Sequence, residues 1–210
     1  MNDTSAALLR AATDLFADHG FDGASVRAIT ARAGVNLGAV TYHFGSKSEL
    51  YHQVLEQATG PLRQALAQAA DRVSPGGFPV GAPERIEAVI RAFFEHLFHH
   101  PELRRIMLQQ VSLAGDLDPA AIKTGRFNHR LIADLIQQGQ EEGAIRDGDP
   151  RMLAFSVAAQ PIAMTFAMPV LRQGIGIDVQ ERAVHQRMVD NAVAFISAGL
   201  ARTERSEESP

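Results

Sequence analysis

Apolar residues recur at helical spacing along most of the chain. In the first stretch they follow the i, i+3, i+4 pattern of an amphipathic helix, at Leu8, Ala11, Ala12, Leu15 and Phe16. This helix is expected to end near His19-Gly20. Alternation of apolar and polar positions, which would predict a strand, never extends beyond a few residues. The pattern therefore predicts an all-α protein.

Two short helices are predicted between about residues 25 and 44. Ser25 can cap the first, which ends at Ala33-Gly34, and Asn36 is a good N-cap for the second. Gly34 allows the positive φ that the tight turn between them requires. Four valine and isoleucine positions are expected to pack the pair against Leu15 and Phe16: Val26, Ile29, Val35 and Val40. A helix pair with a Gly-containing turn is how helix-turn-helix proteins place one helix in the major groove of DNA.

The rest of the chain predicts longer helices. Ser46 and Glu49 form a capping box that opens a helix to about Ala70. Three prolines and three glycines within 74–83 predict a loop. Five further helices are expected at about 84–99, 102–114, 119–141, 150–172 and 179–201. We therefore expect about nine helices, arranged as an N-terminal three-helix helix-turn-helix domain (1–50), a larger C-terminal helical bundle (51–201) and a disordered tail (202–210).

Landmark residues stand at regular positions over the first 55 residues. They are Phe16, Gly20, Phe21, Ser25-Val26-Arg27-Ala28-Ile29, Ala33-Gly34-Val35, Gly38, Tyr42-His43-Phe44, Ser46-Lys47 and Leu50-Tyr51. With this spacing the segment closely resembles the N-terminal domain of the TetR/AcrR family of transcriptional regulators. The remainder of the chain is similar to that family only in being a helical domain of the right size. The resemblance implies a cytoplasmic, DNA-binding homodimer without enzymatic activity or cofactor.

The resemblance also implies roles for individual residues. The helix that begins at Asn36 would be the recognition helix, with base edges faced by Asn36, Leu37, Ala39 and Thr41. Tyr42 and His43 would lie near the phosphates, and Lys47 would contact the DNA backbone beside a helix N-terminus. Arg27 would reach backbone or bases. Many family members carry tyrosine at the position of Thr41, so whether Thr41 or Tyr42 contacts phosphate stays open.

The charge of the N-terminal segment is unusual for a nucleic-acid binder. Residues 1–59 contain four Lys or Arg and six Asp or Glu, whereas such domains are generally basic. Few phosphates per subunit can therefore be neutralised. We expect the affinity to depend on dimerisation and to vary only modestly with salt.

The C-terminal part carries Phe and Met at helical spacing, most of which should form its core. A stripe of these residues also lines adaptable apolar pockets. The resemblance implies that a small apolar or amphipathic effector binds in this domain and releases a repressor from its operator. The candidate pocket residues are Phe94, Leu97, Met107, Val111, Phe127, Leu131, Phe155, Gln160 and Met164.

The segment from Met152 to Leu171 contains no charged residue and many alanines. Small residues let helices approach closely, so 150–172 and 179–201 are predicted to form the dimer interface. Pro161 lies inside this pattern and is expected to kink or break the helix. Gln160 beside it would orient the ligand or cap the freed carbonyl.

Two other functions fit parts of the sequence. His96, His99 and His100 suggest a metal-binding helical enzyme, since residues four apart share a helix face, but no third ligand stands at a suitable spacing. Twenty uncharged residues at 152–171 are long enough to span a membrane, which suggests a membrane-linked interaction module. Two prolines and three polar residues in that run favour a buried helix instead. We therefore expect neither a metal nor a membrane partner. The chain has no cysteine and a net charge of −4.

Overall fold

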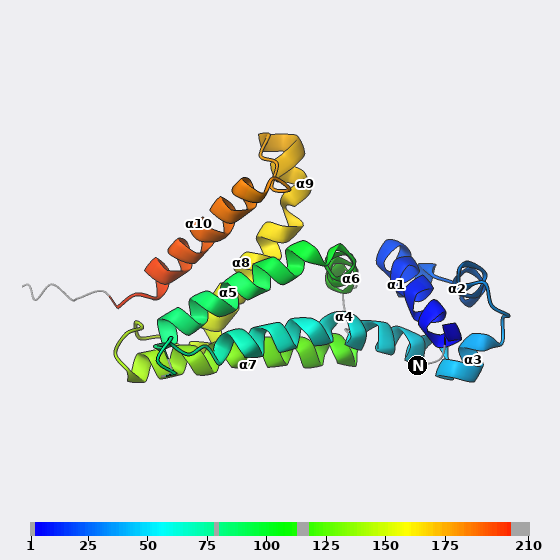
Figure 1. Cartoon of the computed structure of the whole chain (residues 1–210), viewed down its shortest axis with the longest axis horizontal. Coiled ribbons are helices and arrows are strands. Elements are labelled where there is room, and N and C mark those ends of the chain that lie inside the picture. The colour runs from blue at the N-terminus through cyan, green and yellow to red at the C-terminus, as the bar shows by residue number, and fades with distance from the viewer. Residues whose placement is uncertain (1–2, 78–79, 113–117, 203–210) are drawn as a thin grey trace, which may run out of the picture. The chain divides into compact units, whose positions relative to one another are not determined.

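The computed structural model describes residues 3–77, 80–112 and 118–202, and the side chains of Val111 and Ser112 lie outside the described part. The regular structure of these residues is helical throughout, which confirms the predicted all-α class (Figure 1). Ten α-helices and one π-helix follow in order: α1 (Asp3–Gly23), α2 (Val26–Ala33), α3 (Ala39–Phe44), α4 (Lys47–Ala70), α5 (Ala82–His99), α6 (Pro101–Ser112), α7 (Pro119–Glu141), α8 (Pro150–Phe166), α9 (Met168–Val170), η1 (Leu171–Ile175) and α10 (Arg182–Leu200).

The chain divides into two compact units. The first comprises the described residues of Met1–Arg63 and His99–Gly125, and the second those of Gln64–Phe98 and Arg126–Pro210. The first unit thus adds α6 to the three short N-terminal helices and the start of α4, because α6 packs against α1. These units cut across the boundary near residue 50 that the sequence suggested, since a packing partner distant in sequence cannot be read from local periodicity.

The core of the first unit is built on aromatic residues from α1 and α4. Phe16 is 1% exposed, and its ring meets that of Tyr51 edge-on with 4.7 Å between centroids. Phe21 completes the group, 5.1 Å from Tyr51. Gln110 Nε2 on α6 donates a hydrogen bond to the Tyr51 hydroxyl, and burial raises the pKa of Tyr51. The predicted packing of Ile29 and Val40 with this core is confirmed.

The end of α1 bends at Gly20. Its backbone takes φ 69° and ψ −179°, which interrupts the helix where the sequence predicts its end. Glycine adopts this conformation without a steric penalty. A Cβ here would also lie 3.1 Å from Gln109 Oε1 on α6.

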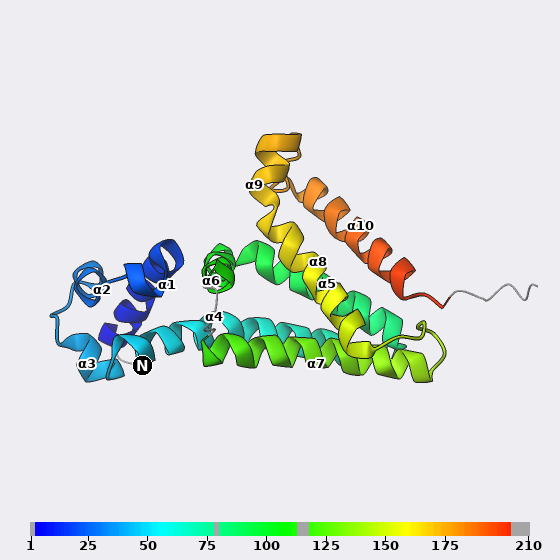
Figure 2. The ribbon, with the colours of Figure 1, turned by 180° about the vertical axis from the view of Figure 1, so that it is seen from behind.

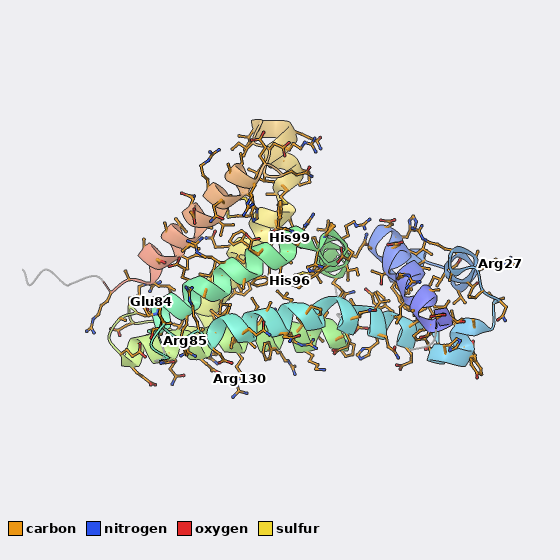
Figure 3. All side chains as sticks on the ribbon, in the orientation of Figure 1. Arg27, Glu84, Arg85, His96, His99 and Arg130 are labelled. Carbon is orange, nitrogen blue, oxygen red and sulfur yellow. The ribbon has the colours of Figure 1, made fainter. Side chains whose placement is uncertain are left out.

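The second unit is held together by polar contacts between helices distant in sequence. Arg85 on α5, labelled in Figure 3, donates to the Ala70 carbonyl (2.5 Å) and to Gln138 Oε1 on α7 (2.8 Å). Arg91 pairs with Asp190 on α10 at 2.6 Å. These bonds connect α5 to both α7 and α10 in one packed body.

The predicted break at Pro161 is wrong. The helix α8 continues through Pro161 to Phe166, and the break follows at Ala167, directly before Met168-Pro169. Pro169 has no amide hydrogen with which to continue the helical ladder. The following segment, Met168–Ile175, is bent by 48° from α8.

Among the described residues no single helix is long and apolar enough to cross a membrane, although α8 and its bent continuation pass that test together on length and composition.

Candidate DNA-binding site

The first helix of the predicted pair has the expected ends. The Ala28 amide donates to Ser25 Oγ at 3.1 Å, so Ser25 is the N-cap of α2. Gly34 follows the helix at φ 68° and ψ 32°, in the left-handed region. The Gly34 and Val35 amides bond back to the Ala31 and Thr30 carbonyls and close the helix end. Both capping predictions are confirmed.

The second helix begins later than predicted. The helix α3 starts at Ala39, with Gly38 as N-cap residue, rather than directly after Asn36. The Asn36 carbonyl accepts a bond of 3.1 Å from the Ala39 amide. Residues 37 and 38 thus form a turn that the main chain of Asn36 closes, and the Asn36 side chain does not act as the cap.

Four predicted site residues are exposed around this turn and helix. They are Asn36, Leu37, Thr41 and Tyr42, of which Leu37 is 56% and Tyr42 83% exposed. Such exposure of a leucine and a tyrosine side by side is unusual for a surface without a partner. Thr41 and Tyr42 are both accessible, so which of them contacts phosphate stays a prediction.

Ala39 corrects the predicted outward face. It is only 6% exposed and belongs to the core that includes Val40 and Phe44. A helix of six residues needs one side for packing, and in α3 that side includes position 39. The Ala39 side chain is therefore not presented to a partner.

A hollow of about 640 Å³ lies beside the exposed residues. Its lining comes from the start of α1, the turn and α3: Thr4, Gly34, Val35, Asn36, Gly38, Ala39, Tyr42 and His43. The Tyr42 and His43 rings meet edge-on with 4.9 Å between centroids, and His43 is half-buried. The hollow thus carries hydrogen-bonding side chains from two elements that are separate in sequence.

Two basic residues flank this surface. Lys47, in the first turn of α4, is half-buried, and its Nζ lies 4.4 Å from the centre of the Phe21 ring. This cation–π contact holds the ammonium group beside the helix N-terminus. Ser46 Oγ accepts from the Glu49 amide at 3.1 Å, which confirms Ser46 as the cap of that helix. Arg27 lies exposed on α2 (Figure 3).

The acidic residues of α1 have partners that the sequence did not reveal. Asp14 pairs with Arg32 on α2 at 2.7 Å, and Asp18 pairs with Arg105 on α6. Two of the six acidic side chains of this segment are thereby matched by cations, which reduces the repulsion of a DNA backbone. Arg105 is 87 positions from Asp18, so no local pattern pointed to it.

The predicted ligand-pocket residues do not share one compact unit. Met107 belongs to the first unit and the Val111 side chain lies outside the described part, whereas the other seven belong to the second. Phe94 and Leu97 are buried core residues, and Leu131, Gln160 and Met164 are half-buried. Phe155 is 65% exposed and Phe127 38% exposed. Phe155 therefore corrects the prediction, because it faces outward from α8 rather than into an interior.

The histidines behind the metal hypothesis do not assemble a ligand set. His100 Nδ1 lies 3.0 Å from Glu102 Oε1. Among the residues that the structure describes, no three His, Cys, Asp or Glu side chains lie close enough together to hold a metal ion.

Comparison with known proteins gives matches over both parts of the chain. Residues 8–54 match the family model described as "Bacterial regulatory proteins, tetR family", and residues 80–160 match "Tetracyclin repressor-like, C-terminal domain". The HTH-type transcriptional repressor SCO4008 of Streptomyces coelicolor is 30% identical over 70% of each chain. The HTH-type transcriptional repressor KstR2 of Mycobacterium tuberculosis is 28% identical over 70% of this chain and 71% of its own.

Solved structures share the fold. That of KstR2 superposes with a TM-score of 0.71 at 22% identity and covers 97% of both chains. SmeT, described as the repressor of a multidrug efflux pump of Stenotrophomonas maltophilia, gives a TM-score of 0.70 at 21% identity, over 100% of this chain and 99% of its own.

Proposed function

Since this chain belongs to the tetR family of bacterial regulatory proteins, we propose that it is a homodimeric repressor released from its operator by a small molecule. The observation that carries the proposal is the exposed surface of the turn and α3, with Leu37 and Tyr42 open to solvent between Arg27 and Lys47. The proposal places the protein in the cytoplasm, in contact with double-stranded DNA.

In this proposal α3 enters the major groove with its N-terminal end foremost. Asn36, Leu37 and Thr41 face base edges, whereas Tyr42 and His43 lie near phosphates. Lys47 donates to the DNA backbone, where the dipole of α4 adds to its charge. Arg27 on α2 contacts the backbone or an adjacent base.

The outward face of α8 supports dimerisation. Its inward residues are spaced four apart, at Leu153, Val157, Pro161 and Thr165. A second apolar stripe lies on the opposite side at alternating spacings of three and four: Met152, Phe155, Ala159, Ile162 and Phe166. Met152 and Phe155 are each 65% exposed. A helix that is apolar on all sides is normally buried on all sides, so this second stripe requires a partner.

The last helix repeats this arrangement. Inward residues of α10 include His185, Val189 and Ile196. Its second stripe consists of Val184, Met188, Asn191, Phe195 and Ala198, and Phe195 is 67% exposed. The chain returns from α9 so that α8 and α10 converge there in both views (Figures 1 and 2). The two stripes together supply two helices to a four-helix contact with a second copy.

The effector part of the proposal rests on the interior of the second unit. Phe94 and Leu97 give it an apolar centre. Two polar atoms, Asn128 Oδ1 and His185 Nδ1, are buried without a hydrogen-bond partner among the described residues. Buried polar atoms are normally satisfied, so an amphipathic ligand with a few hydrogen-bonding groups fits better than a pure hydrocarbon. Binding would shift the dimer population away from the DNA-competent spacing of its recognition helices.

We predict that the protein retards DNA from upstream of its own gene in a gel-shift assay. Replacing Tyr42 or Lys47 by alanine should weaken binding by about tenfold each, the scale of one lost charge-assisted or phosphate contact. Lys47→Ala should also reduce the salt slope by about one. Arg172→Ala, on η1 of the second unit, is the matched control and should bind like the parent. The site assignment is contradicted when both variants bind as well as the parent protein.

For the effector, we predict that a screen of amphipathic compounds finds ligands that raise the melting temperature of the dimer, because a ligand that binds only the folded state stabilises it. The same ligands should lower operator affinity at concentrations near their dissociation constants. Ligands that stabilise the protein but leave operator binding unchanged would contradict the release mechanism without affecting the DNA-binding proposal.

A further inference from the structure

The surface that surrounds α3 carries no charged side chain of its own. Between Arg32 and Lys47 the sequence contains fourteen consecutive residues without Asp, Glu, Lys or Arg. This run includes the whole turn and the whole of α3. A recognition helix without charged residues restricts which base edges it can read.

Each base pair in the major groove prefers particular side chains. Guanine is bound most often by a bidentate Arg or Lys, and the cytosine amino group by Asp or Glu. Neither kind of side chain occurs on this surface. Asparagine binds the N6 and N7 atoms of adenine, and apolar side chains pack against the C5-methyl group of thymine. Asn36 and Leu37 are side chains of these two types, adjacent and exposed.

Leu37 provides the second, independent observation. It is 56% exposed although the core of the first unit lies directly beneath the turn. Its position precedes α3, and the N-terminal residues of a recognition helix are those that contact base edges. An apolar side chain at that place contributes to DNA binding only by burying apolar surface, and in the major groove the thymine methyl is the apolar group offered.

The flanking cations do not change this composition. Lys47 is held over the Phe21 ring at the N-terminus of α4, a position suited to phosphate. Arg27 lies on α2, the helix that crosses the backbone in this motif. A guanine contact by Arg27 would lie at the side of the half-site and not beneath α3.

We propose that the base pairs beneath the start of α3 are A·T pairs in each half-site, with adenine bound by Asn36 and a thymine methyl packed against Leu37. The inference rests on the proposed DNA binding and adds the class of sequence that the protein selects. The operator is then an inverted repeat whose recognised positions are rich in A·T.

The test begins with selection of duplexes from a random-sequence pool by the full-length protein at fixed salt. We expect an inverted repeat with A·T pairs at the positions beneath α3. Deoxyuridine then replaces thymine at those positions, which removes only the methyl group. Loss of one buried methyl should weaken binding about fourfold per half-site, and about fifteenfold when both half-sites are substituted.

A variant comparison assigns the methyl contact to its residue. Leu37→Ala should weaken binding to the thymine operator by a similar factor and should bind the thymine and deoxyuridine operators equally. Leu108→Ala, an exposed leucine on α6, is the matched control and should keep the full deoxyuridine effect.

The inference is overturned when the selected positions are G·C pairs, or when deoxyuridine at every substituted position leaves binding by the parent protein unchanged. It is also overturned when Leu37→Ala still distinguishes the two operators. A failure to select any duplex at low salt overturns the proposed DNA binding itself. That result differs from selection of a G·C-rich operator, which contradicts only the present inference.

Discussion

An aspartate on each outward stripe, introduced by Phe155→Asp and Phe195→Asp, is expected to convert the dimer into monomers and weaken operator binding by about a hundredfold or more. Both side chains are about two-thirds exposed in the single chain, on α8 and α10. In a dimer each aspartate would be buried without a partner, which costs several kcal/mol unless the carboxyl group is neutralised. Two linked recognition helices bind about 100-fold more tightly than one, because the second contact is intramolecular.

The measurement is the molar mass by light scattering after size-exclusion chromatography, followed by operator titration. Ser197→Asp is the matched control, because it adds the same charge to α10 at an exposed position outside the stripe. The control should stay dimeric and bind DNA normally. Circular dichroism must show that the double variant keeps its helices. A folded double variant that remains a dimer would show that subunits associate through another surface.

Truncation of the aromatic core by Phe16→Ala is expected to destabilise the first unit by about 3–5 kcal/mol, the range for a buried aromatic residue replaced by alanine. Phe16 is 1% exposed and packs on Tyr51. The cavity would lie where α1 and α4 meet, so the variant should lose operator binding on moderate warming while the helices of the second unit remain folded.

Urea unfolding monitored by circular dichroism measures this effect. Tyr42→Ala is the control, because it removes an aromatic ring that is 83% exposed and should change the free energy of unfolding by less than about 0.5 kcal/mol. A loss below about 1 kcal/mol for Phe16→Ala would mean that the first unit does not depend on this core.

The parts of the structure that sequence predicted well are determined by neighbouring residues. Ser25 caps α2 through an amide three positions away, and Gly34 ends it through its own backbone freedom. The start of α3 was misplaced because the Asn36 main chain, rather than its side chain, closes the preceding turn. Ala39 is small enough to suit either face, and only its neighbours in space decide its burial.

Contacts between distant segments were beyond the sequence pattern. Pairing of Asp18 with Arg105 and placement of α6 against α1 depend on the tertiary fold. Phe155 shows the same limit for function, because helical spacing marks it as apolar without telling an interior from an outward stripe. Pro161 remained within α8, whereas the break occurred before Pro169, so a proline in a helical pattern indicates a break without locating it.

The central claim is that this TetR-family regulator recognises DNA with α3 from each of two subunits. Hydroxyl-radical footprinting on DNA from upstream of its own gene tests this most directly. The account predicts two symmetric protected segments whose centres lie about 34–36 Å apart, one helical turn of DNA, and it predicts that Tyr42→Ala combined with Lys47→Ala removes both together. Absence of protection at low salt, or an unchanged footprint from the double variant, would contradict it.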